Sequence, residues 1–162
     1  MDDIAKLIDE ARTSLDTARQ SGETERRGAM FPFMSVIEQI GRVATLEPKY
    51  GPQIQQFARD TATLIAHPNF PFALWISELD LVSESTFSYE RFEQLQWMRS
   101  SLQFLFDLYR DTTAADFLST VEQEDIVDID DSIRDLAPSF GGATPPEGTP
   151  EHHWWWSRAA SQ

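Results

Sequence analysis

The stretch from Ser88 to Arg110 carries the strongest helical pattern in the chain. Its apolar side chains recur at spacings of three and four, which places them on one face of a helix: Leu95, Met98, Leu102, Leu105 and Tyr109. A second apolar stripe, formed by Trp97, Phe104 and Leu108, lies about 100° round the same helix. The only strip that stays polar contains Gln96, Ser100, Gln103 and Asp107. A helix this apolar must be covered on two sides, so we expect residues 88–110 to form the central, buried helix of a bundle.

The start of this central helix is marked by residues that stabilise helix N-termini. Ser88 can accept a hydrogen bond from a free backbone amide, and Glu90 lies near the positive end of the helix dipole. Phe87 and Phe92 have the spacing of a hydrophobic staple, in which the residue before the cap packs against the first turn. We therefore expect a capped start with the two phenylalanine rings in contact.

Similar periodicities predict further helices on both sides of the central one. Proline sets several boundaries, because it is favourable in the first turn of a helix and unfavourable inside one. Residues 23–30 are interpreted as a polar link or a weak helical turn between the first two helices, and Pro138 as the stop of the last. The predicted helices cover residues 2–20, 32–46, 52–67, 70–82, 88–110, 113–121 and, as a short last helix, 130–137.

These patterns predict an all-α protein, with a single-domain helical bundle of about six helices over residues 1–137. The chain then changes character, because seven of the 13 residues from Pro138 to Pro150 are glycine or proline. Such a composition favours an extended chain over a helix. Residues 138–162 are therefore predicted to form an extended C-terminal tail.

The tail carries three consecutive tryptophans. Three exposed indoles would promote aggregation, because each has a large apolar area. We expect them to pack against folded protein, either a groove of the same bundle or another chain, with self-association as one form of the second alternative. The candidate partner-binding residues are Trp154, Trp155, Trp156 and His153. In an extended segment Trp154 and Trp156 would face the protein, and Trp155 would face the other side with His153.

The chain is strongly acidic, with 13 Lys and Arg against 27 Asp and Glu and a formal net charge of −14. This charge disfavours direct binding to nucleic acid or to an anionic membrane, because both require a basic surface. It favours a basic protein partner. The densest acidic stretch adds Asp128, Asp130, Asp131, Ile126 and Val127 to the candidate partner-binding residues. We interpret it as a docking edge for such a partner; the alternative is a solvated helix edge.

The sequence contains no motif for catalysis or for a metal site. It lacks HExxH, GxSxG, a P-loop and GxGxxG, and it has no cysteine. The acidic stretch also lacks the glycine and closing glutamate of an EF-hand. His67 has no recognisable nucleophile to activate, and His152 and His153 would point to opposite sides of an extended chain. We therefore assign no catalytic residue, no metal ligand and no cofactor.

The leading functional hypothesis is a non-catalytic acidic protein-binding module, of the inhibitor, immunity or antitoxin, or scaffold type, with a basic or groove-bearing protein as partner. The alternative is a small α-helical enzyme with a carboxylate-bound divalent metal. An enzyme needs a pocket where carboxylates from different helices converge, whereas a binding module needs an apolar patch with an acidic rim. An acidic N-terminus without an export signal predicts a cytoplasmic location.

Overall fold

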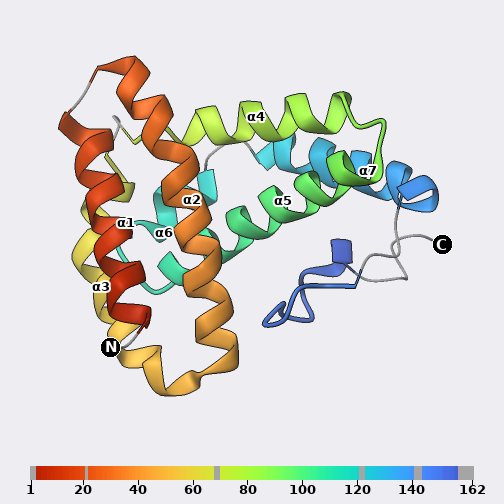
Figure 1. The fold of residues 1–162 in the computed structure, drawn as a ribbon. Helices are drawn as coiled ribbons and strands as arrows, with labels where there is room; N and C mark the ends of the chain where they lie inside the picture. The colour runs from red at the N-terminus through yellow and green to blue at the C-terminus, as the bar shows by residue number, and fades with distance from the viewer. Residues whose placement is uncertain (1–2, 21, 68–69, 121–122, 141–143, 157–162) are drawn as a thin grey trace.

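The structure is a computed structural model, and it describes residues 3–20, 22–67, 70–120, 123–140 and 144–156 (Figure 1). The described residues form seven α-helices and two short 3-10 helices, with no strand among them. The α-helices are α1 (Asp3–Gln20), α2 (Glu23–Leu46), α3 (Gly51–Ile65), α4 (Phe72–Glu84), α5 (Tyr89–Tyr109), α6 (Ala115–Thr120) and α7 (Gln123–Phe140), and the 3-10 helices are η1 (Pro48–Tyr50) and η2 (Trp154–Trp156). The prediction of an all-α single domain is confirmed.

Helix α5 occupies the centre of the bundle, as its apolar pattern predicted. It contacts α2, α3, α4, α6 and α7, and 12 of its residues are buried. Figure 1 shows α1, α2 and α3 together at one end of the molecule, while α4, α5 and α7 extend toward the α4–α5 turn at the other. The central helix therefore joins the two halves of the fold.

The N-terminus of α5 matches the predicted cap but not the predicted staple. The Ser88 Oγ accepts a hydrogen bond from the Arg91 backbone amide at 3.2 Å. Phe92 is buried with 1% of its surface exposed, whereas Phe87 is 84% exposed. The expected contact between these two rings is wrong, because Phe92 already packs against Phe140 of α7 and Phe87 is left in solvent.

Two helices continue through prolines at which the sequence predicted a boundary. α2 begins at Glu23 and includes Pro32, so the predicted polar link is its first part. α7 begins at Gln123 and includes Pro138, so the predicted short helix is too short, and the predicted limit of the bundle at residue 137 falls inside α7. Proline inside a helix costs about 3 kcal/mol, which burial of the flanking apolar side chains offsets. These side chains are Ala29, Met30, Phe33, Ile129, Ile133 and Ala137.

Some predicted segments lie outside the described residues. They are Asp2, at the predicted start of the first helix, Val121, at the predicted end of the sixth helix, and residues 141–143 and 157–162 of the predicted tail. Residues 144–153 contain turns and no helix, which agrees with their proline and glycine content.

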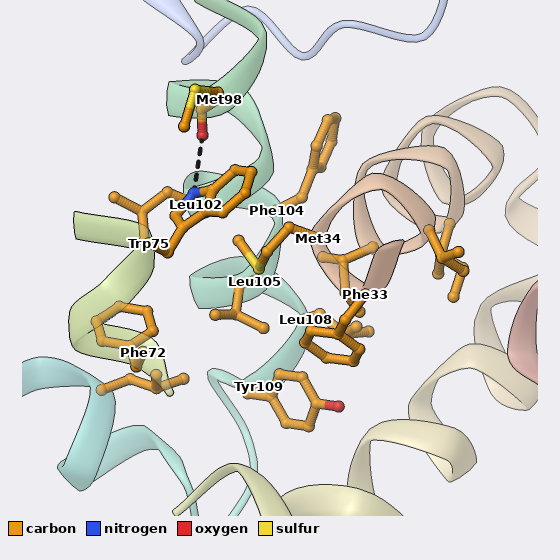
Figure 2. Packing of buried hydrophobic residues seen from close by; sticks show 14 of the residues in the cluster. Phe33, Met34, Phe72, Trp75, Met98, Leu102, Phe104, Leu105, Leu108 and Tyr109 are labelled. Carbon is orange, nitrogen blue, oxygen red and sulfur yellow. Dashed lines mark hydrogen bonds between the residues drawn. The ribbon is translucent and has the colours of Figure 1, made fainter. Parts of the chain in front are cut away.

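The hydrophobic core draws side chains from all the long helices, and Figure 2 shows the part of it where α2, α4 and α5 meet. Trp75 of α4 is fully buried, and its indole Nε1 donates a hydrogen bond to the Met98 carbonyl of α5 at 3.4 Å. Trp97 is only partly buried and packs edge-on against Trp75, with ring centroids 6.0 Å apart. The two tryptophan rings therefore pack together, with Trp75 as the inner, buried ring and Trp97 as the outer, partly exposed one.

Tyr109 makes a buried polar contact between α5 and α3. The Thr61 hydroxyl donates to the Phe57 carbonyl at 2.8 Å and lies 2.7 Å from the Tyr109 hydroxyl. Because the one proton of Thr61 is used toward Phe57, Tyr109 must be the donor in the second bond. Burial raises the pKa of Tyr109 well above its ordinary value of 10.0.

We expect this phenol to make the protein less stable in alkali. A tyrosine in the unfolded chain ionises near pH 10, while Tyr109 in the folded chain keeps its proton, so stability is lost as the pH rises above about 10. Tyr109→Phe should lower the free energy of unfolding by about 1 kcal/mol at neutral pH and flatten its decline in alkali. Urea unfolding across this pH range measures both effects. Tyr89→Phe, at an exposed position, is the matched control, and an equal flattening in it would contradict the assignment.

Candidate functional site

The tryptophan segment docks on its own bundle, along α5. Trp155 and Trp156 are buried, with 2% and 5% of their surfaces exposed. Gln96 of α5 donates a hydrogen bond from Nε2 to the Trp155 carbonyl at 2.7 Å. In Figure 1 the segment is the blue chain that returns beside α5. Of the two alternatives from the sequence, a groove of the same bundle is the one that the structure contains.

The predicted register of the docked indoles is wrong. Residues 154–156 form the 3-10 helix η2 and not an extended strand, so their side chains do not alternate between two opposite sides. Trp155 and Trp156 are buried, and Trp154 is only partly buried. His153 is buried with them at 2% exposure, and its ring stacks on Trp155 with a centroid distance of 4.8 Å.

Ser100 is the polar centre of this docking. Its Oγ accepts hydrogen bonds from the indole Nε1 of both Trp155 and Trp156, each at 2.8 Å. A serine hydroxyl accepts two bonds and donates one, so its proton must go to His153 Nδ1, which lies 3.1 Å away. Neutral His153 then carries its own proton on Nε2, a buried atom with no hydrogen-bond partner among the described residues. Burial, together with the neighbouring His152, lowers the pKa of His153 to about 3.

A second histidine joins this centre from the same turn. His152 Nε2 lies 2.6 Å from Asp107 Oδ2. The His153 amide donates to the Pro150 carbonyl at 3.1 Å, so the chain turns here and is not extended. The prediction that the two histidines point apart is therefore wrong: their rings are perpendicular with centroids 4.8 Å apart. One ligand atom from each of Asp107, His152 and His153 lies within 4.8 Å of the others.

A mainly apolar cavity of about 290 Å³ adjoins these residues. Residues of α2, α3 and α5 line it, and Asp107, Pro150 and His152 complete its wall. Gly41 forms part of the lining, and a Cβ added there would come within 2.1 Å of the Phe104 ring. Glycine thus allows α2 to approach α5 closely beside the docked tail.

The acidic stretch of α7 divides into an inner and an outer face. Asp130 lies inside, where its carboxylate pairs with Arg99 at 2.7 Å, and Ile126 is buried. Asp128 and Asp131 are exposed, and Val127 is 57% exposed. Of the docking edge predicted from the sequence, only these last three residues therefore face outward.

Two arginines, Arg99 of α5 and Arg134 of α7, connect the acidic stretch to the tail. The Arg99 guanidinium lies 4.4 Å from the ring centroid of Trp155, and that of Arg134 lies 4.4 Å from the ring of Trp154. Arg134 also pairs with Asp131 at 3.0 Å. Asp130 and Asp131 thus hold the cations that cover two indoles, which is a role inside the fold.

An apolar patch that sequence reasoning missed lies at the α4–α5 turn. Leu81, Phe87 and Tyr89 are 55%, 84% and 64% exposed. These three residues lie in the 14-residue segment 80–93. The segment contains a single base, Arg91, and four exposed acids: Asp80, Glu84, Glu90 and Glu93. We call Leu81, Phe87 and Tyr89 with these four carboxylates the α4–α5 patch. Its sequence signal was Phe87, an aromatic residue outside the helical stripes.

A groove continues from the patch along α5 to the docked tail. It has a volume of about 400 Å³ and is lined by Glu90, Glu93, Gln94, Trp97, Pro146 and Trp156. Two carboxylates and two indoles therefore share one open hollow. Because Trp156 and Pro146 belong to the tail, docking of the tail completes the groove.

His67, the remaining histidine, lies exposed just after α3 and is not among the residues that gather around Asp107. None of the helices in the described part of the chain is both long and apolar enough to cross a lipid bilayer. Comparison of the chain with protein-family models, with curated proteins and with solved structures finds no match.

Proposed function

We propose that the protein is a non-catalytic acidic binding module that holds a basic protein partner on the α4–α5 patch. The observation that carries this proposal is the exposure of Leu81, Phe87 and Tyr89 within a segment that has four exposed acids and one base. A large exposed apolar group with a charged rim is typical of a protein-binding surface. The net charge of −14 supports a basic partner, because it accelerates the approach of one.

The docked tail moves the proposed binding role away from the tryptophans. Trp155 and Trp156 are buried against α5, so contact with another protein would require them to leave their own bundle. Phe87 needs no such rearrangement. We therefore assign the main apolar contact to Phe87 and the electrostatic contribution to the acids around it and on the outer face of α7.

The groove beside the patch fits a lysine or arginine side chain of the partner. A cation that enters it meets the carboxylates of Glu90 and Glu93 and the rings of Trp97 and Trp156. An aromatic face attracts a cation by about 0.5–2 kcal/mol, and a carboxylate adds a charge-assisted hydrogen bond. A module of this type acts as an inhibitor, as an immunity or antitoxin protein, or as a scaffold.

Site-specific photo-crosslinking in cells of the source organism tests this proposal. A benzophenone analogue of phenylalanine at position 87 should crosslink a discrete set of basic proteins. The same residue at Gln53, an exposed position on α3, is the matched control and should not crosslink them. Equal crosslinking from both positions, or capture of acidic proteins only, would contradict the proposal.

Binding measurements with the captured partner then test the groove. The double variant Glu90→Gln, Glu93→Gln should weaken binding at least about tenfold and reduce its dependence on salt, because two carboxylates that face the cation are lost. The control pair Asp9→Asn, Glu10→Gln removes the same charge from an exposed part of α1. Similar losses in both variants would mean that only net charge matters and that the groove binds no basic side chain.

A further inference from the structure

We propose that Asp107, His152 and His153 form a binding site for one divalent transition-metal ion, with Zn²⁺ as the ion whose ligand preferences fit best. The proposed site uses none of the residues of the α4–α5 patch, which lies at the other end of α5. Two imidazoles and one carboxylate are a ligand set of zinc and of the later first-row metals. Magnesium and calcium prefer oxygen ligands alone.

The positions of the ligand atoms support such a site. One ligand atom of each residue lies within 4.8 Å of the other two, whereas the ligand atoms of a tetrahedral zinc site are about 3.3 Å apart for bonds of about 2.0–2.1 Å. The longest separation must therefore shorten by up to about 1.5 Å, while the 2.6 Å between His152 Nε2 and Asp107 Oδ2 must lengthen by about 0.7 Å. His152 can provide this movement, because its side chain is 54% exposed and is held by a single hydrogen bond to Asp107.

The buried His153 provides the second, independent observation. His153 is only 2% exposed. Its Nε2 atom is buried and has no hydrogen-bond partner among the described residues. A buried polar atom without a partner is costly and calls for an explanation. Coordination of a metal ion by this nitrogen supplies one.

The surrounding hydrogen bonds resemble the outer shell of a metal site. Asp107 Oδ1 accepts hydrogen bonds from Gln103 Nε2 at 3.1 Å and from Arg110 at 2.6 Å. These bonds hold the carboxylate and leave Oδ2 directed at His152. His153 Nδ1 is held by Ser100 at 3.1 Å. Partners of this kind orient metal ligands and fix their protonation.

The local charges leave room for a cation. Two arginines near His153 are neutralised within the fold, Arg42 by Glu38 and Arg99 by Asp130. Asp107 and His152 also line the cavity of about 290 Å³. Three protein ligands leave a coordination position unfilled, and the cavity can admit a small ligand to that position.

Metal binding must also change the contacts of the docked tryptophans. With the ion on Nε2, neutral His153 keeps one proton, which moves to Nδ1 and is donated to Ser100 Oγ. That oxygen already accepts from Trp155 and Trp156, and it has only two lone pairs. One indole N–H must therefore give up its bond to Ser100 when the metal binds.

The test is a titration of the full chain, first freed of metal with a chelator, with Co²⁺ as the optical probe and Zn²⁺ as the competitor. We expect one Co²⁺ to bind per chain, with the visible absorption typical of cobalt with a low coordination number. We also expect Zn²⁺ to displace the cobalt. Indole N–H signals in the NMR spectrum should shift for one or two of the five tryptophans.

Variants of two of the proposed ligands make the test specific. His152→Ala and Asp107→Asn should each weaken Co²⁺ binding at least about tenfold, since each removes one ligand. His67→Ala is the matched control and should bind as the unmodified chain does. Circular dichroism shows whether each variant is folded. Unchanged affinity in folded His152→Ala, equal loss in His67→Ala, or no stoichiometric binding by the unmodified chain would overturn the proposal.

Discussion

Replacing Trp75 with alanine is expected to lower the free energy of unfolding by about 3–5 kcal/mol. The Trp75 side chain is completely buried between α4, α2 and α5, and its indole bonds to the Met98 carbonyl. Truncation leaves a cavity that the surrounding rings cannot fill without distorting the packed helices. A single domain is stabilised by only about 5–15 kcal/mol, so this variant should unfold at a much lower urea concentration.

Trp97→Ala is the matched control for this prediction. Both residues are tryptophans, and their rings are in contact, but Trp97 is only partly buried. We expect Trp97→Ala to lower the free energy of unfolding by about 1–2 kcal/mol. The cost is smaller than for Trp75 because water can fill part of the space that the partly exposed indole occupied. Equal costs for the two variants, measured by urea unfolding with circular dichroism, would contradict the inner and outer positions assigned to them.

The helices could be predicted because their apolar periods are long and regular. The stripe of five apolar residues on α5 predicts a covered central helix, and α5 contacts five other helices. The helix boundaries predicted at Pro32 and Pro138 were wrong because the cost of proline is local. The burial that outweighs this cost depends on contacts with distant segments. Pro32 and Pro138 lie within helices whose neighbouring residues fill the core.

The docking position of the tail had a signal in the sequence that becomes clear only with the structure. The one polar strip of the buried central helix is Gln96, Ser100, Gln103 and Asp107. Gln96 and Ser100 bond to the tail backbone and indoles, Asp107 bonds to His152, and Gln103 bonds to Asp107. A polar strip on a buried helix requires polar partners, and the nearest ones come from a segment more than 40 residues later in the chain.

The side chains that the tail buries could not be predicted, because they depend on its local conformation. An extended segment places alternate residues on one side, whereas consecutive side chains of a 3-10 turn point about 120° apart, so two neighbours can both be buried. Nothing in a run of three tryptophans selects between the two. The hydrogen bonds from Trp155 and Trp156 to a single serine do so in the folded chain.

The protein-binding and metal-binding proposals meet at the docked tail. Trp156 lines the groove beside the α4–α5 patch and also bonds to Ser100, which contacts His153. A metal ion that alters the bonds of Ser100 would therefore act on one wall of the groove. Coupling between two sites requires a shared element whose contacts both ligands change, and Trp156 meets that condition when its indole is the one that leaves Ser100.

Trp155→Ala is expected to release the tail from α5 and to lower the free energy of unfolding by about 3 kcal/mol. The indole is 2% exposed, bonds to Ser100, stacks on His153 and lies under the Arg99 guanidinium. Its truncation removes all three contacts together. If the tail detaches while the helices stay folded, the loss cannot exceed the whole free energy of docking.

Trp154→Ala is the matched control, because it removes a tryptophan from the same segment without releasing the tail. Trp154 is partly buried and contacts the exposed Arg134 and the ring of Trp155, so we expect a loss of no more than about 1 kcal/mol. Trp155→Ala should in addition increase the binding of a hydrophobic dye, because the surface of α5 around Phe104 loses its cover. Helical circular dichroism should stay the same in both variants. If Trp155→Ala loses no more stability than Trp154→Ala and binds no more dye, the tail does not rest on α5 in solution.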